Sequence, residues 1–136
     1  MEKIYAAENS TGNIAKGRIG EEACAEEYEK RGYRIVARNW RRGRIGEIDI
    51  VAESPEKRIL CFCEVKTRKS SDFARASEAV DYKKRLRIRK LAQLFLLERP
   101  YFSDRYVRFD IAEVYCSSEE GREGRELKTD IIEAAF

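Results

Sequence analysis

The chain contains no histidine, and its four cysteines, Cys24, Cys61, Cys63 and Cys116, are spread along the sequence. Cys61 and Cys63 lie two residues apart in one apolar run, whereas the other two cysteines are remote from them. A structural zinc ion takes four cysteine or histidine ligands, so a zinc site would lack partners here. We expect the cysteines to serve as small buried hydrophobic side chains in a reducing compartment.

Long hydrophobic runs are also missing. No apolar stretch approaches the roughly 20 residues that a membrane-spanning helix needs, and no signal-peptide hydrophobic region is present. The sequence therefore predicts a cytoplasmic protein with no membrane partner. With 136 residues, 43% of them hydrophobic, the chain fits one domain with a modest core. Residues 1 to about 12 lack hydrophobic periodicity, so we expect a mobile N-terminal lead-in before a single domain over residues 13–136.

Acidic residues are missing from two stretches, although the net charge of the whole chain is only +3. Residues 31–46 hold six arginines and no acid, and residues 82–97 hold six lysines and arginines and no acid. A charge distribution polarised in this way favours a polyanionic partner such as DNA, although a solvated surface is an equally open interpretation of each stretch. The candidates for nucleic-acid contact in these stretches are Arg41, Arg42, Lys84, Arg85 and Arg89.

Hydrophobic periodicity and turn residues predict an α/β domain with a mixed sheet flanked by helices. The expected order is α-β-β-β-α-β-β. The predicted elements are a helix from about Asn13 to Arg31, strands over Tyr33–Arg38, Gly46–Glu53 and Arg58–Thr67, a helix from an N-cap at Ser77 to about Arg99, and strands over Tyr106–Tyr115 and Lys128–Phe136.

The central hairpin carries charged residues inside otherwise apolar strands. A turn about residues 56 and 57 would place Asp49 opposite Glu64, with Lys66 on the same face as Glu64 because strand side chains alternate. Opposed carboxylates with Cβ atoms roughly 5 Å apart repel each other unless a cation lies between them. A divalent ion such as Mg²⁺ meets this need, since it takes hard oxygen ligands. Lys66 would orient or deprotonate a water molecule, or stabilise charge developing on a phosphate.

A simpler interpretation of Glu64 and Lys66 is a solvated salt bridge at a strand end, which contributes little to stability. The opposed Asp49 and the apolar setting argue against it, because charges inside apolar strands are rare without a partner. Glu47 shares the face of Asp49 and is either a further metal carboxylate or the partner of Lys66 or Arg68. Arg68 either holds a phosphate or is a plain surface arginine.

Two other positions have a structural and a functional interpretation. Arg108 and Asp110 share one face of a predicted strand, and a structural ion pair is the role we expect. Trp40 stands among arginines, where it would either stack on a base or cover the edge of the core.

Several short segments follow one another in a specific order. They are Gly17-Arg18-Ile19-Gly20-Glu21, Asn39-Trp40-Arg41, Gly46-Glu47-Ile48-Asp49, Glu64-Val65-Lys66-Thr67-Arg68, Lys84, Arg108-Phe109-Asp110 and the final Ile131-Ile132-Glu133-Ala134-Ala135-Phe136. In this order they resemble the YraN-like family of uncharacterised, endonuclease-like bacterial proteins within the PD-(D/E)xK nuclease superfamily. The resemblance spans about residues 17–136 and implies a restriction-endonuclease-like fold.

The resemblance also implies roles for individual residues. Asp49 and Glu64 correspond to the metal-holding acids of the superfamily motif, and Lys66 corresponds to its lysine. Glu21 resembles a first-helix glutamate that completes the acidic site in resolvase-like relatives. The chain departs from the pattern at Ile48, where many superfamily members have proline.

The function expected on these grounds is that of a DNA endonuclease dependent on Mg²⁺ or Mn²⁺, which hydrolyses phosphodiesters in branched or processed DNA. Two alternatives stay open at this point. One is a catalytically inactive nucleic-acid-binding protein of the same fold, and the other is a protein whose charges serve a protein partner. By analogy with junction-cleaving relatives, which are dimers, a homodimer is a further expectation.

Overall fold

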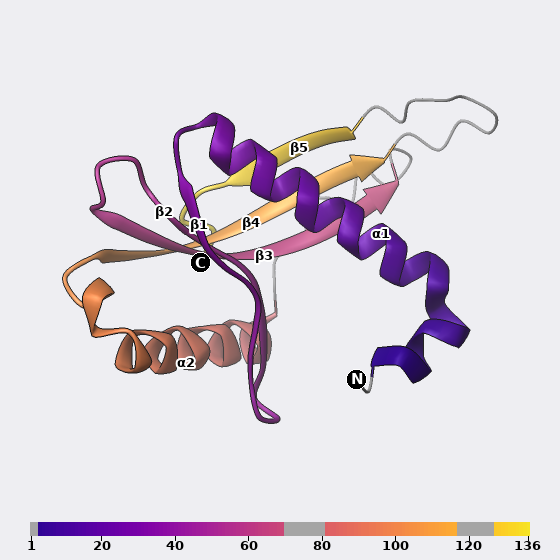
Figure 1. Cartoon of the computed structure of the whole chain (residues 1–136), viewed down its shortest axis with the longest axis horizontal. Helices are drawn as coiled ribbons and strands as arrows, with labels where there is room; N and C mark the ends of the chain where they lie inside the picture. The colour runs from indigo at the N-terminus through magenta and orange to yellow at the C-terminus, as the bar shows by residue number, and fades with distance from the viewer. Residues whose placement is uncertain (1–2, 70–80, 117–126) are drawn as a thin grey trace.

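The computed structural model describes residues 3–69, 81–116 and 127–136 of the chain (Figure 1). Its elements follow in the order α1 (Lys3–Lys30), β1 (Arg34–Arg42), β2 (Gly46–Glu53), β3 (Ile59–Lys69), α2 (Tyr82–Glu98), the short 3-10 helix η2 (Pro100–Phe102), β4 (Tyr106–Cys116) and β5 (Leu127–Ile132). Apart from the added η2, this is the predicted succession of helix, three strands, helix and two strands. Within the described residues, no helix is both long and apolar enough to cross a membrane.

The strands form one mixed sheet in the order β1-β2-β3-β4-β5. Neighbouring strands are antiparallel except β3 and β4, which are parallel. A parallel pair needs a crossover connection, and α2 lies in the connection between β3 and β4. The predicted α/β class with a mixed sheet is confirmed, and the arrangement is consistent with a restriction-endonuclease-like fold.

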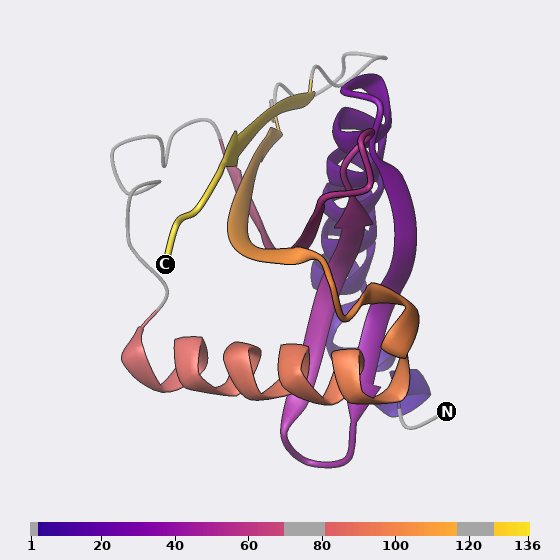
Figure 2. The same cartoon turned by 90° about the vertical axis from the view of Figure 1, so that its left-hand side faces the viewer.

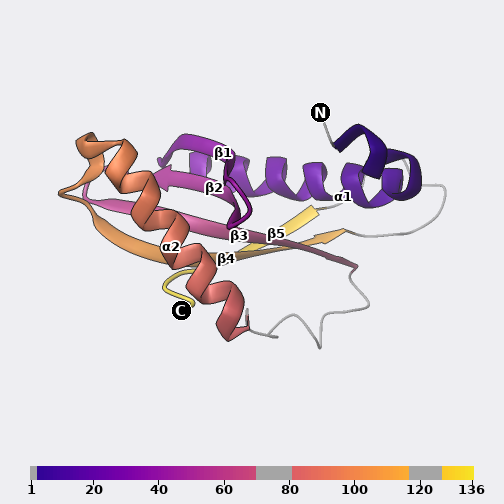
Figure 3. The ribbon, with the colours of Figure 1, turned by 90° about the horizontal axis from the view of Figure 1, so that it is seen from below.

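The two long helices cover opposite faces of the sheet (Figure 3). Neighbouring strand residues point to opposite faces, so each strand serves two cores. The core under α1 contains Cys24, Tyr28, Ile50, Cys63 and Ala112. The core under α2 contains Val51, Phe62, Leu91, Phe95 and Phe109. This double burial explains why β2 and β3 are apolar over most of their length.

Aromatic packing settles the role of Trp40. The side chain is 6% exposed, and its ring packs edge-on against Phe95 with centroids 5.2 Å apart. Trp40 therefore belongs to the core under α2, which is the structural alternative considered for it. All four cysteines are buried and free of disulfides, as expected.

Helix α1 begins earlier than predicted. It starts at Lys3 and not at Asn13, so residues 3–12, predicted to form a mobile lead-in, are helical. The prediction rested on the lack of hydrophobic periodicity in residues 1 to about 12, and a helix can form without an apolar face where it need not pack against a core. The mobility of this segment stays a prediction.

Three other boundaries also differ from the predicted ones. Strand β1 runs to Arg42 and not only to Arg38. Helix α2 begins after Asp81, whose Oδ1 accepts a hydrogen bond from the Lys84 N–H at 2.9 Å. The predicted N-cap, Ser77, lies outside the described residues and does not start this helix. Strand β5 ends at Ile132, because Ala134 turns the chain with a φ of 51°.

Candidate metal site

The β2–β3 hairpin has the predicted register. Ile50 pairs with Cys63 and Glu53 with Leu60, so continuing the ladder by one residue places Asp49 opposite Glu64. The ladder of backbone hydrogen bonds between the two strands ends there. The Val65 N–H instead donates a hydrogen bond to the Asp49 carboxylate at 2.8 Å.

Strand β1 is kinked beside the same position. Asn39 has a φ of 49° between the Arg38–Ile50 and Trp40–Ile48 pairs that flank Asp49. Asparagine tolerates this left-handed conformation better than most residues. The sheet is thus irregular on both sides of Asp49.

Three carboxylates converge at this point. Oxygens of Glu21, Glu47 and Asp49 all lie within 4.8 Å of one another. Glu47 and Asp49 share a face of β2, and Glu21 approaches from α1. The helix comes this close because residue 20 is glycine: a Cβ there would lie 2.0 Å from the Thr67 hydroxyl oxygen of β3.

The crowding changes the acid–base behaviour of Asp49. Burial raises the pKa of Asp49 to about 8, with further increases from the charges of Glu64 and Glu21, while the Val65 N–H acts in the opposite direction. The metal-free site therefore favours a proton on Asp49 at neutral pH. Hard carboxylate oxygens in this number and spacing fit a divalent cation, so the three acids could hold a metal ion.

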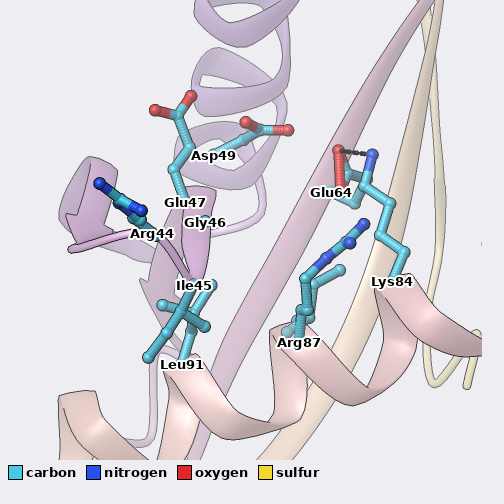
Figure 4. A pocket seen from close by; sticks show the side chains of 10 residues that line it. Arg44, Ile45, Gly46, Glu47, Asp49, Glu64, Lys84, Arg87 and Leu91 are labelled. Atoms are coloured by element: carbon cyan, nitrogen blue, oxygen red, sulfur yellow. Dashed lines mark ion pairs between the residues drawn. The ribbon is translucent and has the colours of Figure 1, made fainter.

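A cleft of about 410 Å³ opens beside the acids, and β2, β3, α2 and the turn before β2 form its walls (Figure 4). Its charged lining consists of the acidic Glu47, Asp49 and Glu64 and the basic Arg44, Lys84 and Arg87. The turn between β1 and β2 lies alongside α2 in two perpendicular views (Figures 1 and 2).

Glu64 lines the cleft with Asp49, as expected, but it is not among the three converging carboxylates. Its Oε1 forms an ion pair with the Lys84 ammonium at 3.0 Å, which directs the Glu64 side chain toward α2 (Figure 4). The expected metal ligands were Glu21, Asp49 and Glu64, whereas the three acids whose oxygens converge are Glu21, Glu47 and Asp49. Metal binding by Glu64 stays a prediction. The sequence indicated Glu47 because it stands two residues before Asp49, which places both side chains on one face of the strand.

Lys66 follows Glu64 on the same face of β3 but does not line the cleft. Burial lowers the pKa of Lys66, and the neighbouring charges of Arg68 and Lys84 lower it further. Arg68 lies farther along β3, with its Nε buried. Glu47 pairs with Arg41 at 3.1 Å, and the salt bridge considered between Glu47 and Lys66 or Arg68 stays a prediction.

Most of the predicted nucleic-acid contacts are engaged within the protein. Besides Arg41 and Lys84, Arg42 donates to Glu98 at 2.6 Å and lies over the Trp40 ring. The guanidinium of Arg89 lies 4.7 Å from the centre of the Phe109 ring, and that of Arg85 lies 5.8 Å from the Phe136 ring.

Two cleft residues, Arg44 and Arg87, were not among the predicted contacts. Arg87 had a detectable signal, because it follows Lys84 by three residues and so lies on the same helix face. Arg44 had none beyond its place in the arginine-rich stretch, since its position depends on the course of the β1–β2 turn.

In a comparison with known proteins, residues 20–114 match a family described as "Uncharacterised protein family UPF0102". A UPF0102 protein of Acetivibrio thermocellus is 38% identical over 128 residues, which cover 94% of this chain and 95% of the relative. A UPF0102 protein of Moorella thermoacetica is 42% identical over 121 residues, covering 89% and 94% of the two chains. The matched region contains Glu21, Glu47, Asp49 and Glu64.

Proposed function

The chain belongs to the uncharacterised protein family UPF0102, and from its site we propose that it is a metal-dependent DNA endonuclease that uses Mg²⁺ or Mn²⁺. The observation that carries this proposal is the convergence of Glu21, Glu47 and Asp49 within 4.8 Å at the wall of an open cleft. Such crowding disfavours the metal-free ionised state and is typical of sites built for a cation.

The surroundings supply the other groups that phosphodiester hydrolysis needs. Glu21, Glu47 and Asp49 would hold the ion. When bound, a divalent ion activates a coordinated water and neutralises charge on a phosphate oxygen. Lys66, with its lowered pKa, lies near enough to Glu64 to feel its charge and is suited to orient a water or to stabilise a phosphate oxygen.

The test is cleavage of single-stranded, duplex, flap and four-way-junction DNA, with Mg²⁺, with Mn²⁺ and with EDTA. We expect metal-dependent cleavage of at least one substrate, and its loss in Asp49→Asn and Glu47→Gln. Glu56→Gln is the matched control, since Glu56 is an exposed acid in the turn between β2 and β3. DNA binding without cleavage under every condition would favour the catalytically inactive nucleic-acid-binding protein instead.

A further inference from the structure

Arg44 and Arg87 differ from the other basic residues around the cleft. Both are exposed, and in the described part of the chain neither guanidinium lies within 4.0 Å of a carboxylate oxygen. Lys84, the third cation of the lining, is neutralised by Glu64. The charge of Arg87 also acts on the Asp81 carboxylate, but the two groups form no salt bridge. A guanidinium outside any salt bridge keeps its fork of N–H donors for a ligand from outside.

The two arginines lie on different walls of the cleft. Arg44 belongs to the turn between β1 and β2 and lies beside Glu47, whereas Arg87 extends from α2 toward Glu64 (Figure 4). The turn is anchored to α2, since a Cβ at Gly46 would meet the Leu91 side chain at 3.8 Å. The backbone positions from which the two side chains extend are therefore set by packed elements.

Charge balance indicates what the two groups bind. The cleft lining has three acidic and three basic side chains, so their formal charges cancel. Glu21 adds a third acid to the converging group, so a divalent ion held by Glu21, Glu47 and Asp49 would leave one negative charge on that group. With Lys84 paired to Glu64, the positive charges that remain are those of Arg44 and Arg87, and the site as a whole becomes cationic by one charge. A ligand with two anionic groups, one on each side of the acids, would give each guanidinium a partner.

We propose that Arg44 and Arg87 form a clamp that binds two backbone phosphates of one DNA strand, on either side of the acidic cluster. This inference rests on the proposed function and adds the groups that hold the substrate. Arginine suits the task because its planar fork can donate two hydrogen bonds to one phosphate. Phosphate contacts of this kind position the strand and do not select a base sequence.

The experiment measures binding of a fluorescein-labelled DNA duplex by anisotropy over a range of salt concentrations. Ca²⁺ is present throughout at a fixed concentration in place of Mg²⁺ and Mn²⁺, so that the acids can hold a divalent ion, and gel electrophoresis of the recovered duplex confirms that it is uncleaved. The proteins are the wild type, Arg44→Gln, Arg87→Gln and the double variant. Arg58→Gln is the control, because Arg58 is exposed and lies outside the cleft lining, at the end of the hairpin away from Glu64. Thermal melting confirms that each variant is folded.

We expect each clamp substitution to lower the slope of log affinity against log salt by about 0.9 and the double variant to lower it by about 1.8. Affinity at about 0.1 M salt should fall roughly eightfold for each lost contact. Arg58→Gln should leave slope and affinity unchanged. Equal slopes in the wild type and the double variant would overturn the clamp, as would a slope that falls only in an Arg85→Gln/Arg89→Gln protein.

The result is separable from the fate of the proposed function. Salt-dependent binding that needs Arg44 and Arg87, with no cleavage by any metal-loaded protein, would refute the nuclease and support the clamp. Metal-dependent cleavage together with unchanged slopes in both clamp variants would support the nuclease and refute the clamp.

Discussion

Two aspartates within strands of the same sheet, Asp110 in β4 and Asp49 in β2, have opposite surroundings. Asp110 is fully buried and surrounded by donors: the Tyr28 hydroxyl at 2.7 Å, the Arg108 guanidinium at 2.9 and 3.0 Å, and the Ala134 N–H at 3.1 Å. Asp49 accepts a backbone hydrogen bond and otherwise faces other carboxylates. Asp110 is thus stabilised by the donors around it, whereas Asp49 is repelled by the charges of neighbouring carboxylates.

The difference separates carboxylates that hold the fold together from carboxylates that could hold a metal ion. A buried charge is costly unless it is paired and hydrogen-bonded, and Asp110 meets this condition. Glu53 resembles Asp110, because it is 1% exposed and pairs with Arg34 at 3.1 Å and Arg105 at 2.9 Å. A site whose acids crowd one another lowers stability in the metal-free protein, a feature common at functional sites.

The largest effect is expected from Asp110→Ala. The substitution leaves the part-buried Arg108 guanidinium without its partner and the buried Tyr28 hydroxyl without an acceptor, which should lower the free energy of unfolding by about 3–5 kcal/mol. Urea denaturation measures the loss. Glu56→Ala, which changes an exposed acid, should have no measurable effect. A loss below about 1 kcal/mol in Asp110→Ala would remove the distinction between the two aspartates.

The addition of a divalent metal should stabilise the protein through Asp49, the second aspartate of the comparison. At a concentration about 100 times its Kd, Mn²⁺ or Mg²⁺ should raise the free energy of unfolding by about 2.7 kcal/mol, because it binds the folded state only. The increase should vanish in Asp49→Asn and Glu47→Gln and persist in Glu98→Gln, whose acid is exposed on α2. Equal stabilisation of all these proteins would mean that the ion binds elsewhere.

The metal-free protein should become more stable when Asp49 loses its charge. The pKa of Asp49 is about 8 in the folded protein, above the value of about 3.9 for an unfolded chain. The folded state thus binds more protons between these values, and stability falls as pH rises from about 4 to about 8. Asp49→Asn removes this titration while its amide oxygen can still accept from the Val65 N–H.

The variant should be more stable than the wild type by about 1–2 kcal/mol near pH 8, and its stability should fall less steeply between about pH 4 and pH 8. Urea denaturation at several pH values in EDTA measures both quantities. Asp104→Asn, which changes an exposed acid, should follow the wild-type profile. A less stable Asp49→Asn protein with an unchanged profile would make Asp49 a structural residue like Asp110.

The sequence was sufficient to predict features that depend on neighbouring strands. Strand alternation and a short turn set the β2–β3 register, so the opposition of Asp49 and Glu64 followed from counting residues. The expected ion pair of Arg108 with Asp110 is confirmed for the same reason, because both lie on one face of β4. Both results follow from the alternation of successive strand side chains between the two faces of the sheet.

Features that depend on the crossing of distant elements were not predictable in this way. The ion pair of Lys84 with Glu64 requires α2 to cross β3 at one place, and no periodic pattern encodes that crossing. The contact between the Arg89 guanidinium and the Phe109 ring was likewise not predictable, because it brings α2 and β4 together only in the folded protein. DNA contact by Arg89 stays a prediction. Charge runs in the sequence mark basic segments without showing which side chains stay available.

The smallest stability effect, and the sharpest test of the two classes of carboxylate, is expected from Lys84→Met. Methionine keeps the apolar stem and removes the charge that directs Glu64 toward α2. Because the Lys84 side chain is 41% exposed, the free energy of unfolding should change by less than about 1 kcal/mol. Metal affinity should rise, since the released Glu64 can then join Asp49 and its neighbours around the ion, and isothermal titration with Mn²⁺ measures the change. Lys90→Met on the exposed side of α2 should leave affinity unchanged. Weaker metal binding in Lys84→Met alone would show instead that Lys84 holds Glu64 in place for the ion, which would give this carboxylate the cation support that Asp110 has and Asp49 lacks.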